Sequence, residues 1–598
     1  MSYDTDKLLP GLQRIDVIQL DFGLCIHVYG SAPCAATGSG DGKCRNSWAT
    51  CQDKTNYDET SSVRTLSLCT AVSELPIAGY IPCLESVSFD PGDISPDDGI
   101  GKVSSVTVKF RDVPSDDTAI DPYVTDRTYN PLTQGTLWPK VRAIWPYYQG
   151  RTLRWYTGYI NGAFSLSNLR MRQYVIESME GFGRKSGVTI KAKDPVKLAD
   201  NSRAQFPKKS TGQLAVAISD VATPTTIDIT TEETTEYDLY PFESLSCVNM
   251  SGECFRYTGT TIVTGGIRLT GVTRGPPSPY VTEQAAHEVG DDVQKCAYWN
   301  DMIPPVIIGR LMTLGAEIPD AFVPYATTWT TLYSTWMGSQ SLTRLVCEPI
   351  GVNEQISEVM MQSNSWGVWW DDVAQVVNYE VFRPAALGEV VVSITDESNI
   401  IQNMVTVADD NDRLLNECVF WYGQIDPTKD VEDTTNYTNA VDHIDPDSVD
   451  TNAVGSLRTK TIYGAWHASA TRTIIKRIAR RFISARNAVP FKVTLEFMRK
   501  DDSLETADFI DLQTSAIRDA SGALLTTRMR VVKADHGKDT VSYTAIQDFT
   551  SKRYGLIAPT ALAGTTWATA TQAQKDTYVF VANNSGYMSD GTPGKRIF

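Results

Sequence analysis

The sequence predicts a multidomain, mainly β protein, built of β-barrels and small β-modules with a minor share of α-helix. The chain has 598 residues, which is more than one hydrophobic core usually organises, so about three to five domains are expected. Hydrophobic residues make up 42% of it and charged residues 21%, so there is enough apolar surface for several cores. Apolar and polar residues alternate with a period of two in several segments, as in half-buried antiparallel strands.

This alternation, together with turn signals, places the expected elements along the chain. We expect strands at 102–113, 171–181, 187–194 and 539–549. Turn residues gather at 90–101, 274–280 and 323–329. Helical spacing is rarer, and we expect helices at 213–222, 352–364 and 468–487. Strands therefore outnumber helices.

The same signals divide the chain into six expected segments. They are an N-terminal strand with a cysteine-rich module (1–83), a first β-rich domain (84–240), a small β-module (241–300), a mixed α/β domain (301–374), a second β-rich domain (375–555) and a C-terminal extension (556–598). The second β-rich domain contains a polar, acidic insertion at 425–455, which we interpret as a solvated loop between strands.

The balance of charged residues argues against a general nucleic-acid binder. Lys and Arg number 54 against 71 Asp and Glu, a net charge of −17, and an acidic surface repels a phosphate backbone. The opening residues lack the basic and apolar regions of a signal peptide. The best apolar candidate for a membrane span, 303–319, is broken by Pro304, Pro305 and Arg310. We expect a soluble protein, made in a cytoplasm, without stable membrane insertion.

The helix expected at 468–487 is basic and amphipathic. Its arginines accompany a stripe of isoleucine and phenylalanine, as in a helix that binds a membrane surface. A helix that packs this stripe on a β-sheet and turns its arginines towards acidic neighbours has the same pattern. In a chain with a net charge of −17 we favour the structural interpretation.

The sequence contains few motifs that are typical of catalytic sites. The five histidines stand in no recognisable zinc-protease, nucleophile-elbow or phosphate-loop motif. Cys296 follows His287 along the chain, but its surroundings lack the setting of a papain-like nucleophile, so a structural role is favoured. We expect that the protein is not an enzyme.

The cysteines cluster near the N-terminus. Six of the eleven fall within the first 83 residues, and the first four, Cys25, Cys34, Cys44 and Cys51, form a C-x8-C pair and a C-x6-C pair. Zinc sites usually take two ligands from a tighter C-x2-4-C turn, whereas an iron–sulfur cluster accepts thiolates from loops further apart. The alternative is that these cysteines are small buried hydrophobes. Their Gly/Ser-rich flank, 30–44, offers little core to pack into, which favours ligation.

Several segments carry a resemblance to a known family. The stretches 43–58, 101–117, 121–160, 172–181 and 188–214 resemble the N-terminal half of tail-tip, or baseplate hub, proteins of long-tailed (siphovirus-type) phages and prophages. The stretch 250–291, with its "TRG" and "H..G" signals, is similar to a strand–turn module common in those proteins, and 553–598 resembles their C-terminal tail. The resemblance spans most of the chain and is weakest between 300 and 460.

The resemblance implies a structural role in a virion. Such hubs form a homotrimeric ring at the tail tip, in which each chain carries two similar β-barrels, so that three chains mimic a six-fold tube. Blocks 84–200 and about 375–555 could supply the two barrels. The implied partners are the distal tail protein, the tape-measure protein and distal tip or fibre proteins. DNA would pass through the channel without sequence-specific contact. The alternative is a cell-wall hydrolase carried at the tip.

The resemblance also implies ligands for a cofactor. Lambda-like tail-tip proteins with an iron–sulfur cluster have a C-x-x-x-Y-G-x-x-x-C stretch followed by a C-x6-C pair, and "CIHVYGSAPC" and "CRNSWATC" are similar to both. The implied ligands are Cys25, Cys34, Cys44 and Cys51, around a cluster of [4Fe–4S] type that acts as a structural staple without redox chemistry. Cys69 is an alternative fourth ligand and Cys83 a weaker one. The later Cys254, Cys347 and Cys418 are expected to be small buried side chains.

Overall fold

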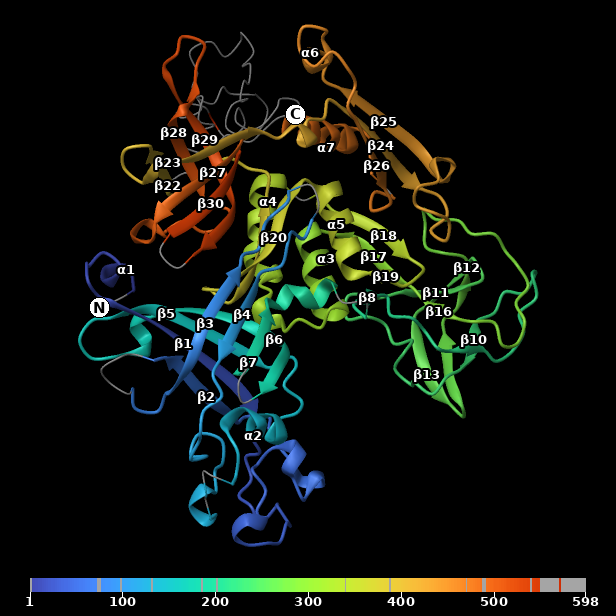
Figure 1. The fold of residues 1–598 in the computed structure, drawn as a ribbon. Coiled ribbons are helices and arrows are strands. Elements are labelled where there is room, and N and C mark those ends of the chain that lie inside the picture. The colour runs from blue at the N-terminus through green and yellow to red at the C-terminus, as the bar shows by residue number, and fades with distance from the viewer. Residues whose placement is uncertain are drawn as a thin grey trace.

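The computed structural model describes residues 3–71, 77–96, 99–128, 130, 133–183, 187–200, 203–338, 340–386, 389–468, 470–486, 491–537, 540–548, 569 and 571. The described chain is mainly β with few helices, which confirms the predicted fold class (Figure 1). The C-terminal extension expected at 556–598 lies outside the described residues, apart from Thr569 and Thr571.

A closed seven-stranded barrel forms the N-terminal third. Its strands are β1 (Gln13–Gly23), β2 (Val63–Thr70), β3 (Ile81–Asp90), β4 (Ser105–Phe110), β5 (Thr152–Ile160), β6 (Arg170–Gly183) and β7 (Gly187–Lys193), in the order β1-β2-β3-β4-β7-β6-β5. All neighbours are antiparallel except β2 and β3. Alternate residues of β4, namely Val106, Val108 and Phe110, fill the barrel, which is why the period-two pattern predicted β4, β6 and β7 correctly. The barrel takes strands from both of the first two expected segments.

Helix α2 (Leu137–Ile144) covers the end of the barrel from which the β1–β2 loop leaves. Trp138 is fully buried, and its indole Nε1 donates to the carbonyl of Arg111 at 3.1 Å. Trp145, just after the helix, stacks on Phe22 at 4.8 Å between ring centroids and donates to the carbonyl of Gly23. These contacts fix the point where the loop begins.

A second β-rich unit lies beside the barrel, drawn in orange and red in Figure 1. It is a six-stranded sheet of β22 (Val391–Thr395), β28 (Phe509–Arg518), β29 (Leu524–His536), β30 (Thr540–Gln547), β27 (Phe491–Met498) and β23 (Ile400–Asp409), in that order. Strand β30 confirms the strand predicted at 539–549. The resemblance implies two similar barrels, but in the described residues this second sheet is open, with β22 at one edge and β23 at the other.

A mixed α/β region joins the two β-rich units and holds the largest hydrophobic cluster, around Trp299, Trp329 and Trp466. Its elements are β17 (Ala297–Met302) paired with β18 (Leu342–Val346), β20 (Ser365–Asp371) paired with β21 (Val376–Val381), β19 (Ile350–Gly351) paired with β8 (Gln205–Phe206), and helices α3 (Pro304–Arg310), α4 (Thr330–Met337) and α5 (Val352–Ser363). Helix α5 was predicted correctly. Within the described chain, no helix has the length and apolar character needed to span a membrane.

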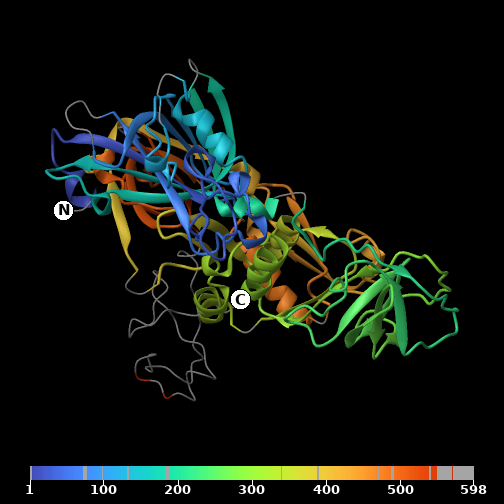
Figure 2. The same cartoon turned by 90° about the horizontal axis from the view of Figure 1, so that it is seen from below.

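A small β-module projects from this region, away from the two β-rich units (Figure 2). Two four-stranded sheets enclose its core. One contains β13 (Gly259–Val263), β14 (Gly266–Thr270), β10 (Thr226–Thr230) and β9 (Gln213–Leu214); the other contains β15 (Thr273–Arg274), β12 (Glu253–Tyr257), β11 (Ser246–Met250) and β16 (Gln294–Lys295). The helix predicted at 213–222 is wrong. Leu214 pairs with Ile229, and Val216 and Val221 are exposed, so pairing with distant strands overrides the local helical spacing.

A three-stranded sheet stands above the module in Figure 1. It contains β25 (Tyr437–Ile444), β24 (Glu417–Gln424) and β26 (Thr459–Gly464), and α7 (Arg472–Ser484) packs on it. Helix α7 confirms the helix expected at 468–487, and its Ile475, Ile478 and Phe482 are buried against the sheet, as the structural interpretation requires. The acidic insertion is not wholly a loop, because β25 and the short α6 (Pro446–Val449) lie within it. At the other end of the chain, α1 (Tyr3–Asp6) precedes β1.

Acid should destabilise the central region through His467. Its ring is buried, and Nε2 lies 3.1 Å from the carbonyl oxygen of Gln362. Burial lowers the pKa of His467 from 6.5 to about 4. Between these values the unfolded chain binds a proton that the folded chain does not. Stability should therefore fall as the pH drops from 6.5 towards 4, by roughly 3 kcal/mol in all.

The thermal midpoint of the protein, recorded at pH 7 and pH 5, measures this effect. His467→Gln keeps a donor for Gln362 but cannot ionise, so its midpoint should fall less on acidification. His27→Gln is the control, because His27 lies half-buried in the β1–β2 loop, outside the central region. Equal acid sensitivity of the His467 variant and the unmodified chain would contradict the assignment.

Candidate metal centre

The four predicted cysteine ligands lie in the long loop between β1 and β2, residues 24–62. The loop contains only three single turns of 3-10 helix: Gly40–Gly42, Trp48–Thr50 and Lys54–Asn56. None of the hydrophobic clusters formed by the described residues includes a side chain from this loop. The loop therefore needs something other than an apolar core to hold its shape.

Arg127 supplies part of that support from outside the loop. Its guanidinium donates to the carbonyl oxygens of Asp41 at 2.8 Å and of Lys43 and Cys44 at 2.9 Å each. The carboxylate of Asp121 pairs with the same guanidinium. Since the Arg127 side chain is only 7% exposed, one buried cation fixes the backbone that leads into Cys44.

Asn46 connects the two cysteine pairs. The backbone N–H of Cys25 donates to the carbonyl of Asn46 at 2.7 Å, and the Asn46 side-chain amide donates to the carbonyls of Cys25 and His27, at 3.2 Å each. Asn46 adopts a φ of 52°, a left-handed conformation that asparagine tolerates better than most residues. This turn carries the chain back so that the Cys25 and Cys44 segments lie side by side.

The four thiols lie close enough together for the charge on one to affect the pKa of another. Burial raises the pKa of Cys44, and the neighbouring Cys51, Cys34 and Cys25 raise it further. Burial likewise raises the pKa of Cys51, with added contributions from Cys25 and Cys34. A bound cation would reverse this effect, because a metal favours the deprotonated thiolate.

Two of the sulfurs already accept backbone hydrogen bonds. The N–H of Asn46 donates to the Sγ of Cys44 at 3.4 Å, and the N–H of Asp53 donates to the sulfur of Cys51. In both cases the donor lies two residues after the cysteine. Hydrogen bonds to the sulfurs are among the features that tune protein-bound iron–sulfur clusters.

The four thiols could serve as ligands of an iron–sulfur cluster. The donor set consists of four cysteines from one loop, residues 24–62. Unlike a second group described below, their four sulfurs do not all lie within 4.8 Å of one another. A cluster of several irons holds its ligands further apart than a single tetrahedral ion does. Cys25, Cys34, Cys44 and Cys51 could therefore hold such a cluster.

The alternative ligands lie elsewhere. Cys69 is buried in β2 and pairs with Val17, six residues before the end of β1 at Gly23. Because a strand rises about 3.3 Å per residue, Cys69 lies roughly 20 Å from the point where the Cys25 loop begins. Cys83 is buried in β3, inside the barrel. The structure does not bring either cysteine to the four-thiol group.

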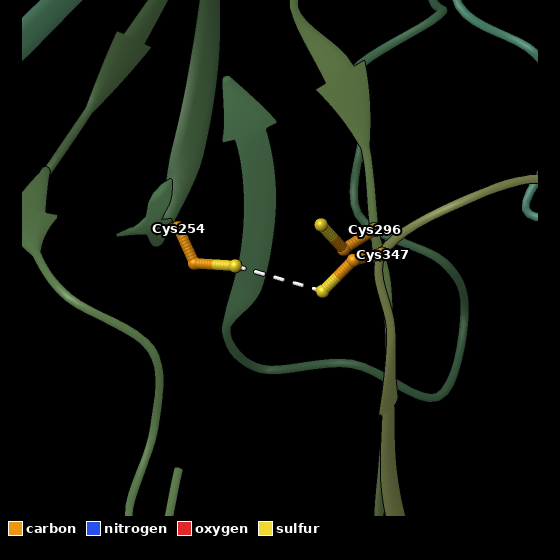
Figure 3. A group of neighbouring side chains, drawn as sticks. All are labelled: Cys254, Cys296 and Cys347. Carbon is orange, nitrogen blue, oxygen red and sulfur yellow. Dashed lines mark hydrogen bonds between the residues drawn. The ribbon is translucent and has the colours of Figure 1, made fainter. Parts of the chain in front are cut away.

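Three cysteines that sequence analysis treated as structural do meet: Cys254, Cys296 and Cys347 (Figure 3). They come from three separate strand regions, so no local sequence motif predicts that they meet. The one local signal is Cys247, which forms with Cys254 a C-x6-C pair of the same spacing as Cys44 and Cys51.

His287 serves a structural purpose. Its Nε2 lies 3.0 Å from Oε2 of the buried Glu253, and Nε of Arg274 donates to Oε1 of the same carboxylate at 2.6 Å. These residues belong to the "TRG" and "H..G" signals of the sequence, and their network ties β12 to the loop before β16. His287 therefore pairs with the carboxylate of Glu253 and not with the thiol of Cys296. This agrees with the expectation that Cys296 is not a catalytic nucleophile activated by His287.

Comparisons with known proteins give likenesses of low sequence identity and low TM-score. No family model and no curated protein matches the chain. A 43 kDa tail protein of prophage MuSo2 from Shewanella oneidensis aligns at 8% identity with a TM-score of 0.35, over 78% of this chain and 98% of that one. The prophage tail protein gp18 of Listeria monocytogenes aligns at 10% identity with a TM-score of 0.27, over 76% of this chain and 89% of that one. The type VI secretion protein c3393 of E. coli aligns at 8% identity with a TM-score of 0.30, over 78% of this chain and 74% of that one. With TM-scores below 0.5, these likenesses assign neither a family nor a function.

Proposed function

We propose that this chain is the structural hub of a siphovirus-type phage tail tip, assembled in the host cytoplasm and located in the virion. Three copies form a ring that closes the tail tube. The ring binds the distal tail and tape-measure proteins on the tube side and anchors distal tip or fibre proteins beyond it. An iron–sulfur cluster held by Cys25, Cys34, Cys44 and Cys51 staples the N-terminal loop.

The observation that carries this proposal is the presence of two β-rich units in one chain. The closed barrel of β1–β7 and the six-stranded sheet of β22, β23 and β27–β30 lie side by side. Three chains with two such units each present six β-rich units around one axis, which matches a six-fold tube. A closed ring of this kind is the usual outcome of cyclic symmetry among identical chains.

The two units are joined by buried polar contacts, as a rigid ring requires. The backbone N–H of Ile94, after β3, donates to the carbonyl of Val532 in β29 at 3.0 Å. Asp502, before β28, is fully buried and accepts from Lys7 at 2.7 Å and from the Tyr3 hydroxyl. These contacts fix the spacing of the two units within a chain.

The small amount of apolar packing in residues 24–62 supports the proposed cluster. Residues 24–62 contribute to no hydrophobic cluster of the described chain, so the free energy that orders them must come from elsewhere. Ligation of four cysteines orders a loop because binding free energy is also folding free energy. This role needs no electron transfer.

The charge of the chain suits a channel for DNA. A net charge of −17 disfavours adhesion of a phosphate backbone, so DNA can slide past the chain rather than bind it. The most basic helix, α7, uses its apolar side for packing on β24 and β25. Its exposed Lys476, Arg477 and Arg480 are free to meet the acidic surface of a neighbouring tail protein.

The full chain, purified without oxygen and imaged by electron cryomicroscopy, tests the hub directly. We expect closed rings of three copies around an axial channel. Persistent monomers, also in the presence of the distal tail protein, or rings of another order would contradict the proposal. A peptidoglycan-cleavage assay on the same sample separates it from the tail-borne hydrolase, because the hub should leave peptidoglycan intact.

A further inference from the structure

A second group of cysteines lies where the small β-module meets the central region. Cys254 in β12, Cys296 between β16 and β17, and Cys347 just after β18 point their sulfurs at one another (Figure 3). Their three Sγ atoms all lie within 4.8 Å of one another, and those of Cys254 and Cys347 are 3.5 Å apart. All three residues are at most 2% exposed.

Strand pairing produces this convergence and adds a fourth cysteine. Val248 pairs with Lys295, and the N–H of Cys296 donates to the carbonyl of Cys247 at 2.8 Å, so Cys247 and Cys296 are cross-strand neighbours. Ala297 pairs with Val346, which places Cys296 opposite Cys347 by the same register. Cys247 is fully buried and packs in the same cluster as the other three cysteines.

We propose that Cys254, Cys296 and Cys347 bind a structural Zn²⁺ ion, and that a rotation of the neighbouring Cys247, whose sulfur is not within 4.8 Å of all three, supplies the fourth ligand. A tetrahedral zinc with bonds of about 2.3 Å to thiolates holds its sulfurs about 3.8 Å apart. The separations among the three sulfurs, from 3.5 Å to no more than 4.8 Å, bracket this distance. The ion displaces the protons of the thiols as it binds, with no change in oxidation state.

The surroundings suit a buried site of negative charge. Arg256 pairs with Cys247 across β11 and β12, and its Nε is buried without a hydrogen-bond partner in the described structure. A zinc ion with four thiolates carries two negative charges, which this guanidinium would partly offset. The apolar neighbours Tyr280 and Leu345 close the site from solvent, as is usual for structural zinc.

The geometry disfavours the other roles of such a group. A disulfide needs sulfurs about 2.05 Å apart, well below the 3.5 Å between Cys254 and Cys347. An iron–sulfur cluster is larger than the space between three sulfurs that all lie within 4.8 Å. Zinc here ties β11 and β12 of the small module to Cys347 of the central region. The site would thus hold the projecting module in place, whether or not the chain is a hub.

The metal content of the full chain, purified without oxygen or added metal, tests the site. Because the cysteines are buried, zinc should be released only when the protein is unfolded, and a chromogenic chelator should then detect about one zinc per chain. A protein that is folded and free of zinc overturns the proposal. So does a Cys254–Cys347 disulfide found by mass spectrometry of that sample.

Variants assign the ligands and separate this site from the first. Cys254→Ser and Cys347→Ser should each lose most of the zinc, while their iron content stays unchanged. Cys418→Ser is the matched control, since Cys418 is equally buried but lies in the cluster of β24 and α7. If the serine variants do not fold, replacement of the bound metal by cobalt in the unmodified chain still tests whether the cysteines form a metal site. Tetrahedral thiolate bands in the visible spectrum support the site, and their absence overturns it.

Discussion

Replacement of any one of Cys25, Cys34, Cys44 or Cys51 by serine should remove most of the iron from the protein and loosen residues 24–62, if the proposed cluster is present. Each thiol is a proposed ligand that serine cannot replace well, and the loop contributes to no hydrophobic cluster of the described chain. The effect should be of similar size at all four positions. Iron content and hydrogen exchange of the loop amides measure it.

Cys69→Ser is the matched control for these four variants. Cys69 is buried in β2 and packs beside Val17 and Leu169, so serine there should cost roughly 1–3 kcal/mol of stability. Its iron content should stay that of the unmodified chain. A Cys51→Ser protein that keeps its iron, beside a Cys69→Ser protein that loses it, would show that the fourth ligand was assigned wrongly.

Asp502→Asn should separate the two β-rich units. Asp502 has no exposed side-chain surface and accepts from Lys7, whose side chain is 6% exposed, and from the Tyr3 hydroxyl. Arg170 of β6 lies 3.7 Å from the same carboxylate. Among the described residues, removal of the negative charge leaves Lys7 with only the exposed Asp4 as a carboxylate partner and Arg170 with only Glu505. The loss should therefore not exceed about 3 kcal/mol, the lower end for a broken buried pair.

Thermal unfolding and hydrogen exchange at the junction of the barrel and the six-stranded sheet measure this loss. Asp228→Asn is the control, because Asp228 forms an ion pair with Arg268 on the open surface of the small module, where such pairs contribute little. We expect the junction to exchange faster only in the Asp502 variant. Unchanged exchange there would mean that other contacts hold the two units together.

Sequence patterns predicted those elements whose burial follows a local period. Strands β4, β6, β7 and β30 each bury alternate residues, so the period-two pattern was sufficient. Helices α5 and α7 each bury one stripe against a sheet or core. Helix α3 was not predicted, because it begins with two prolines and is buried on most sides, which removes the periodic signal.

The two groups of cysteines show that sequence patterns also predict a site only when its residues are close together along the chain. Cys25, Cys34, Cys44 and Cys51 are neighbours along one loop, so their spacing and the family resemblance led to the prediction of a common site. Cys254, Cys296 and Cys347 meet only through the registers of β11 with β12, of β11 with β16 and of β17 with β18. Pairings between distant strands are not legible in one sequence, so the second group needed the structure.

The most direct test of the proposed hub with its staple is the iron and acid-labile sulfide content of the full chain, purified without oxygen. We expect a brown protein with a broad visible absorption and about four iron and four sulfide per chain, as a [4Fe–4S] cluster requires. A colourless, well-folded protein without iron would contradict the cluster and leave residues 24–62 to be held by polar contacts, such as those of Arg127, Asn46 and the Arg151–Glu59 ion pair.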